Sequence, residues 1–140
     1  MILHFSYEEL TALRAGAEVY LEGETASGGS VMAPPRVRGH VQALLPHLHG
    51  DMSLSTLGEL RGVQSAVRAV VEMLRAEMES VVVVTHAADE GAVAAYFDFA
   101  HAFTVAHRID EMVSEMTAMI ELVTGEAPTH LTERTFQFPD

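Results

Sequence analysis

Apolar residues recur every three or four positions between residues 60 and 74, and this pattern limits the possible folds more than any other feature of the chain. They are Leu60, Val63, Val67, Val70 and Leu74. Such spacing places all of them on one face of an α-helix, which must bury that face. The seam reaches Glu77 after about two heptads, which is a short repeat for a zipper between two chains. We therefore expect it to form part of the core of a single chain.

The residues on either side set the expected limits of this helix. Ser53 or Ser55 is the expected N-cap, because a hydroxyl there can accept a hydrogen bond from a backbone N–H of the first turn. Four consecutive valines follow at residues 81–84. We expect them to form the buried last turn of the helix, although β-branched residues also suit a short strand.

A second long helix is expected after a turn near residues 85–89, running to about Thr124. Asp89 and Glu90 would lie in its first turn, where negative charge is favourable, and Gly125 would provide its C-cap. With a turn near residue 86 or 87, the two long helices would form an antiparallel hairpin.

The N-terminal half is expected to contain two shorter helices. Ser6 and Glu9 have the spacing of a capping box, which predicts a helix from about residue 7 to 22 that stops at Gly23. Residues 23–35, GETASGGSVMAPP, predict a flexible loop because they are rich in glycine and proline and have no periodicity. The next helix would begin at Pro34 or Pro35 and be interrupted by Pro46.

Together these segments predict one all-α domain over residues 1–140, a four-helix up-and-down bundle whose two long C-terminal helices form a hairpin. Residues 126–140 would form an extended tail that pairs with the first residues of the chain. The alternative is a small α+β domain with short strands at 1–5, 81–85 and 134–138.

Charge and composition restrict the partners. The 140 residues include 20 acidic residues and 8 basic ones, all arginine, for a formal net charge of −12. This balance disfavours nucleic-acid binding and suits a basic protein partner. The chain contains no cysteine, which fits the cytoplasm. It also has neither a signal-peptide pattern nor an apolar run of about twenty residues, so no membrane association is expected.

The stretch YFDFAHAFTVAHRIDEM, residues 96–112, places five ionisable residues within an apolar region. At about 100° per residue, the apolar residues of the second half of this helix cluster in one arc: Val105, Ile109, Met112, Met116, Ile120 and Val123. His107, Asp110 and Glu111 fall opposite this arc and should face water. Asp98 and His101 fall on or beside that arc, three residues apart on one face. A polar pair on a buried face costs several kcal/mol unless it is hydrogen-bonded, so a partner is required.

Glu77 is the expected partner. In a hairpin that turns near residue 86 or 87, residue 77 lies level with about residue 96, so Glu77, Asp98 and His101 would share one dry layer. We interpret this cluster as a hydrogen-bonded core network that could serve as a binding site. The same residues are weak candidates for metal ligands, because di-iron bundles use two Glu-x-x-His motifs and here only one Asp-x-x-His is present. No metal or other cofactor is expected.

The function expected from these features is a non-catalytic helical interaction protein, either a homo-oligomer, such as a homodimer, or the acidic partner of a basic protein. No Ser-His-Asp, Cys-His or Gly-x-Ser-x-Gly arrangement is visible in the sequence. Two alternatives remain open. One is a metal-dependent oxidase or hydrolase that uses the Glu/Asp/His cluster, and the other is an acidic inhibitor that mimics nucleic acid.

Overall fold

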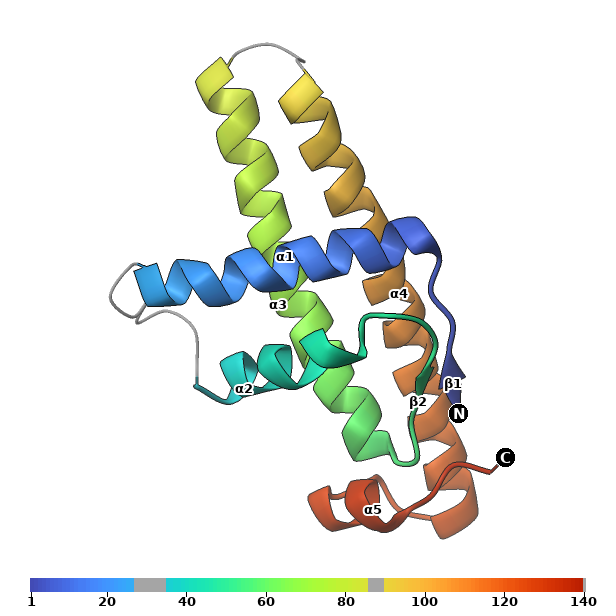
Figure 1. Cartoon of the computed structure of the whole chain (residues 1–140). Coiled ribbons are helices and arrows are strands. Elements are labelled where there is room, and N and C mark those ends of the chain that lie inside the picture. The colour runs from blue at the N-terminus through green and yellow to red at the C-terminus, as the bar shows by residue number, and fades with distance from the viewer. Residues whose placement is uncertain (27–34, 86–89, 140) are drawn as a thin grey trace.

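The computed structural model of the chain describes residues 1–26, 35–85 and 90–139 (Figure 1). These residues form five α-helices, one 3₁₀ turn and one pair of two-residue strands. The helices are α1 (Tyr7–Ala26), α2 (Pro35–Leu44), α3 (Leu57–Thr85), α4 (Glu90–Thr124) and α5 (His130–Thr135). The 3₁₀ turn covers Leu45–His47, and the strands are β1 (Ile2–Leu3) and β2 (Met52–Ser53).

The long helices α3 and α4 pack antiparallel, as the sequence predicts (Figure 1). All five residues of the α3 seam are buried, and the predicted continuation of α3 through the valine run is confirmed, since the helix ends at Thr85. The facing side of α4 buries mainly small and β-branched residues: Ala92, Ala102, Val105, Ala106, Ile109, Val113 and Ile120. Val123, in the last turn of α4, is 68% exposed.

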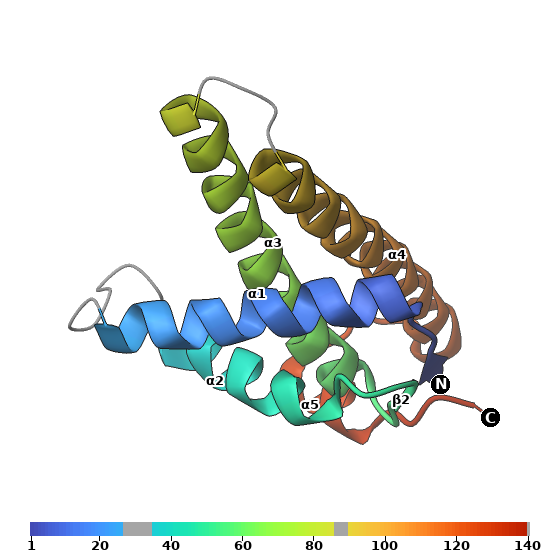
Figure 2. The same ribbon diagram turned by 45° about the horizontal axis from the view of Figure 1, so that its top comes forward.

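Helix α1 crosses the hairpin instead of running alongside it, which both views show (Figures 1 and 2). Gly16 makes the crossing close, because a Cβ atom at this position would lie 2.6 Å from Cγ1 of Val70 on α3. The predicted up-and-down order of four parallel or antiparallel helices is therefore wrong in its arrangement, although the helical class is correct. The periodicity of α1 predicts a helix with a buried face and carries no information on the crossing angle.

The capping box that opens α1 is confirmed. The Ser6 hydroxyl accepts a hydrogen bond from the Glu9 backbone N–H at 3.1 Å, and the Glu9 carboxylate accepts one from the Ser6 N–H at 2.8 Å. The helix runs past the expected stop at Gly23 and ends at Ala26. The rest of the expected flexible loop, residues 27–34, lies outside the described residues.

Helix α2 begins at Pro35, as predicted, and gives way to the 3₁₀ turn that contains Pro46. The cap of α3 is Thr56 rather than Ser53 or Ser55. The Thr56 hydroxyl accepts from the Glu59 backbone N–H at 3.2 Å, and the Glu59 carboxylate accepts from the Ser55 N–H at 2.7 Å. Helix α3 is therefore capped one residue later than expected, and its Glu59 carboxylate binds the residue before the cap.

Both ends of the chain pair with the segment before α3. Strand β1 pairs antiparallel with β2, with Leu3 opposite Met52, and Gln137 forms an isolated bridge with Thr56. The expected pairing of the tail with the first residues is thus wrong. The tail also contains α5, where an extended segment was expected. A strand at 81–85, part of the α+β alternative, is excluded because these residues are helical.

The core lies where α1, α2 and α4 meet the first two-thirds of α3. Its largest fully buried side chains include Leu13, Leu48, Leu57, Leu60 and Ile109. The outer part of the hairpin, beyond the α1 crossing, has no third helix beside it in the described part of the chain (Figure 1). In the residues that the structure describes, none of the helices is both long enough and apolar enough to span a membrane.

Candidate functional site

The three residues predicted to form a dry layer lie in the outer part of the hairpin. Glu77 is exposed, and Asp98 and His101 are half-buried. The expectation of a buried acid–imidazole layer is therefore wrong, because the outer hairpin has only two helices and water reaches the sides that a third would cover. Among the described residues, no group of three or more histidine, aspartate or glutamate side chains is arranged to hold a metal ion.

His101 contacts an aromatic ring on its own helix. Its imidazole stacks on the Phe97 ring with the ring centroids 6.5 Å apart, and Phe97 meets Tyr96 edge-on at 5.7 Å. Phe99 and Phe103 form a second ring pair at 5.7 Å. The outer half of α4 is thus dominated by aromatic contacts and not by an acid–imidazole network.

Four large apolar side chains of this half of α4 are exposed, and we call them the aromatic face of α4. They are Val93 at 44% exposure, Tyr96 at 55%, Phe97 at 53% and Phe103 at 48%. Their spacing places them, with the half-buried Ala100, within an arc of about 120° on one side of the helix. Single exposed apolar residues are ordinary, but a contiguous row of aromatic ones is typical of an interaction surface.

The outer part of the hairpin is rich in carboxylates. Residues 72–80 and 90–103 contain five acidic residues and one arginine. The acidic ones are Glu72, Glu77, Glu79, Glu90 and Asp98. The arginine, Arg75, lies over the Phe99 ring with its guanidinium carbon 5.5 Å from the centroid, and it also pairs with Glu72 at 3.4 Å. The part of the hairpin that carries the aromatic face therefore has a net negative charge.

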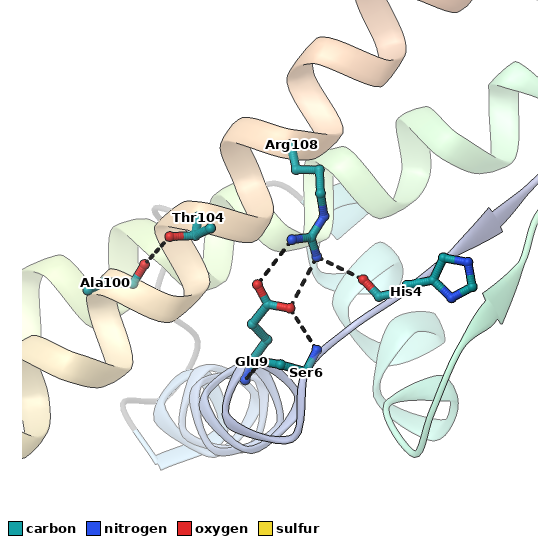
Figure 3. A network of polar contacts seen from close by, with 6 residues as sticks. All are labelled: His4, Ser6, Glu9, Ala100, Thr104 and Arg108. Atoms are coloured by element: carbon teal, nitrogen blue, oxygen red, sulfur yellow. Dashed lines mark hydrogen bonds and ion pairs between the residues drawn. The ribbon is translucent and has the colours of Figure 1, made fainter.

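A network of hydrogen bonds and an ion pair joins α1 to α4 (Figure 3). Arg108 donates to both carboxylate oxygens of Glu9, from Nη1 to Oε2 at 3.1 Å and from Nη2 to Oε1 at 3.2 Å. Its Nη2 also donates to the backbone carbonyl of His4 at 2.9 Å. Since Glu9 accepts from the Ser6 backbone as well, this fork ties the start of α1 to the middle of α4.

Glu9 is only 7% exposed, and its environment fixes its protonation state. Burial raises the pKa of this carboxyl, but the hydrogen bonds and charge of Arg108 and the hydrogen bonds from Ser6 outweigh that effect, so the pKa lies below its ordinary value. A carboxylate with all its partners in place is suited to holding the fold and not to transferring protons.

Sequence reasoning assigned Glu9 to the capping box and missed its contact with Arg108. The sequence spacing contained a signal for the burial of Glu9. It lies four residues before Leu13, on the same face of α1, and Leu13 is completely buried. Its partner Arg108 could not have been identified, since the pairing depends on how α1 crosses the hairpin. By contrast, the expected exposed pair of His107 and Glu111 is confirmed, with Nε2 of the histidine 3.2 Å from Oε1 of the glutamate.

Comparisons of the chain with protein-family models, with curated proteins and with solved structures gave no match. The function is therefore inferred from the chemistry of the surface residues.

Proposed function

We propose that the protein is a non-catalytic interaction protein whose aromatic face on α4 binds a basic amphipathic helix of another protein. The observation that carries this proposal is the row of four exposed apolar side chains on one side of α4. Removing such side chains from water contributes about 1.5 to 3 kcal/mol each when burial is complete, which is enough for specific recognition.

The spacing of the face supports a helical partner. Val93 and Phe103 are ten residues apart on a continuous helix, and at 1.5 Å per residue the row is about 15 Å long. A partner helix of about three turns would cover it, with its own apolar residues spaced three or four apart.

The charge of the outer hairpin supports a basic partner. Residues 72–80 and 90–103 contain five carboxylates and one arginine. Lysine or arginine flanking the apolar stripe of a partner helix would be attracted by this net negative charge, which would speed association. A second copy of this chain would instead bring the same negative charges together, so a homodimer through this face is less favourable.

The proposal is tested with a synthetic amphipathic helix that carries leucine on one face and lysine on the other. Isothermal titration should show saturable 1:1 binding to the wild-type protein. In the double variant Phe97→Ser, Phe103→Ser, binding should weaken at least about tenfold, because two apolar anchors are lost and no charge changes.

Leu122→Ser is the matched control, since Leu122 is an exposed apolar residue of α4 outside the aromatic face, 85% exposed. Its affinity for the peptide should equal that of the wild type. If the double variant binds the peptide with the same affinity as the wild type, the binding is non-specific charge attraction and the proposal is refuted. If light scattering shows that the wild type is a dimer and the double variant a monomer, the face binds a second copy of the chain instead.

A further inference from the structure

A cleft of about 1210 Å³ lies at the other end of α3, between α2, the first turns of α3 and α5. Both α2 and α5 pack against α3. Two glycines of α3 line the cleft one helical turn apart. A Cβ atom at Gly62 would lie 3.7 Å from the His40 ring, and one at Gly58 would lie 3.4 Å from the Glu133 carbonyl oxygen. The absence of side chains at these positions lets both neighbouring elements approach α3 closely.

The walls of the cleft carry matching pairs of basic side chains. Arg36 and His40 are four residues apart on α2, and His130 and Arg134 are four residues apart on α5. With Arg61 and His47, the cleft contains three of the eight arginines and three of the eight histidines of the chain. In a protein with a formal charge of −12, this grouping of basic residues is unexpected for a general solvated surface.

The acidic residues of the cleft are already engaged. Asp51 lies 3.0 Å from the His4 ring nitrogen, and the Glu133 carboxylate lies 2.9 Å from Arg61. Glu59 accepts the capping hydrogen bond from the Ser55 backbone. Among the arginines of the cleft, these contacts engage Arg61 but not Arg36 or Arg134.

In the described part of the chain, neither Arg36 nor Arg134 has an ion-pair partner, and both side chains are exposed. His40 also lines the cleft, but its Nδ1 is buried and cannot be reached from it. The guanidinium groups of Arg36 and Arg134 can both donate to an anion in the cleft.

We propose that this cleft binds the phosphate group of a small molecule, with Arg36 and Arg134 holding the anion from opposite walls. A guanidinium group offers two parallel N–H donors that match the oxygens of phosphate. The volume of the cleft is large enough for the rest of a small molecule beside the phosphate. The site is independent of the aromatic face of α4.

The test uses inorganic phosphate and sulfate with ¹⁵N-labelled full-length protein in NMR titrations at constant ionic strength. Shift changes should saturate and concentrate in α2, α5 and residues 58–65. The double variant Arg36→Gln, Arg134→Gln should bind both anions at least about tenfold more weakly, because two charge-assisted contacts are lost. Arg14→Gln, on α1 outside the cleft, is the control for charge and should leave the affinity unchanged.

The proposal is overturned if shifts scatter over the surface or fail to saturate. It is also overturned if Arg14→Gln weakens binding as much as the double variant.

Discussion

At the scale of single residues, the carboxylate of Glu9 joins the start of α1 to the middle of α4. It accepts from the Ser6 backbone and from two nitrogens of Arg108, and it is nearly excluded from water. Arg108 is partly exposed, its side chain being 40% accessible, so solvent screens part of the attraction. Removing the carboxylate would leave a guanidinium without its counter-ion and a helix without part of its cap.

Glu9→Gln should therefore lower the free energy of unfolding by about 1 to 3 kcal/mol at pH 7. Urea unfolding followed by circular dichroism measures this change. Glu8→Gln is the matched control, because Glu8 is the adjacent residue and is exposed. Its effect should stay within about 0.5 kcal/mol. Equal effects of the two substitutions would show that the fork contributes nothing beyond surface charge.

The lowered pKa of Glu9 gives this contribution a pH dependence. A carboxyl whose pKa is lower in the folded state stabilises the fold above its unfolded value, 4.5, and loses that contribution as the pH falls through the folded value. The difference in unfolding free energy between wild type and Glu9→Gln should therefore shrink between pH 7 and pH 3. A difference that stays constant or grows on acidification would contradict this assignment.

At the scale of elements, the crossing of α1 over α3 depends on Gly16. A methyl group there would meet Val70 at 2.6 Å, and Val70 is fully buried and β-branched, so it cannot easily rotate away. Gly16→Ala should destabilise the protein by about 1 to 3 kcal/mol, although alanine favours the helix. Gly39→Ala in α2, where no atom lies within 4 Å of the new methyl group, should be neutral or stabilise by up to about 1 kcal/mol. Thermal unfolding of both variants distinguishes the two effects, and a stabilising Gly16→Ala would mean that the helices lie farther apart.

The two halves of α4 should also differ in local stability. Between residues 90 and 101 only Ala92 is buried, whereas residues 102–113 bury five side chains. Local opening is easier where few apolar contacts are lost. Amide hydrogens of residues 94–101 should therefore exchange at least about tenfold faster than those of residues 106–113, as native-state hydrogen exchange can measure. Uniform protection along α4 would indicate that another element covers its outer half.

The parts of the fold that depend on local patterns could be predicted from the sequence. The α3 seam, the hairpin, the capping box at Ser6 and the C-cap at Gly125 all follow from spacing or from backbone preference, and Gly125 has a φ of +75°. The crossing of α1 and the helix in the tail could not, because they depend on contacts between distant segments. The same limit explains why the dry layer around Glu77 was wrong.

The candidate site was predicted only as a region. The stretch 96–112 attracted attention for its charges, but the exposed aromatic residues among them carry the proposal. The helical wheel that places His107 and Glu111 in water puts Phe97 and Phe103 on the same side, but it cannot show whether another helix covers that side. The outer hairpin leaves that side of α4 open, and only the arrangement of the helices reveals it.

At the scale of the whole molecule, charge is divided between two ends of α3. The outer hairpin combines exposed aromatic residues with a net negative charge, and the cleft beside α5 contains Arg36, Arg61 and Arg134. Peptide binding at the aromatic face should weaken as sodium chloride is raised from 50 to 500 mM, because screening removes the charge attraction. Residual affinity should remain at high salt, because burial of the aromatic row does not depend on ionic strength. Titration calorimetry measures this dependence. Complete loss of binding at high salt would show that apolar burial contributes nothing to the affinity.

The measurement that tests the central claim most directly is residue-resolved hydrogen exchange of the full-length protein with and without the leucine–lysine peptide. The account predicts new protection in residues 93–104 of α4 and in the adjoining turns of α3, with exchange in α2 and α5 unchanged. Protection confined to other elements, or the same protection in the Phe97→Ser, Phe103→Ser variant, would show that the aromatic face is not where a partner binds.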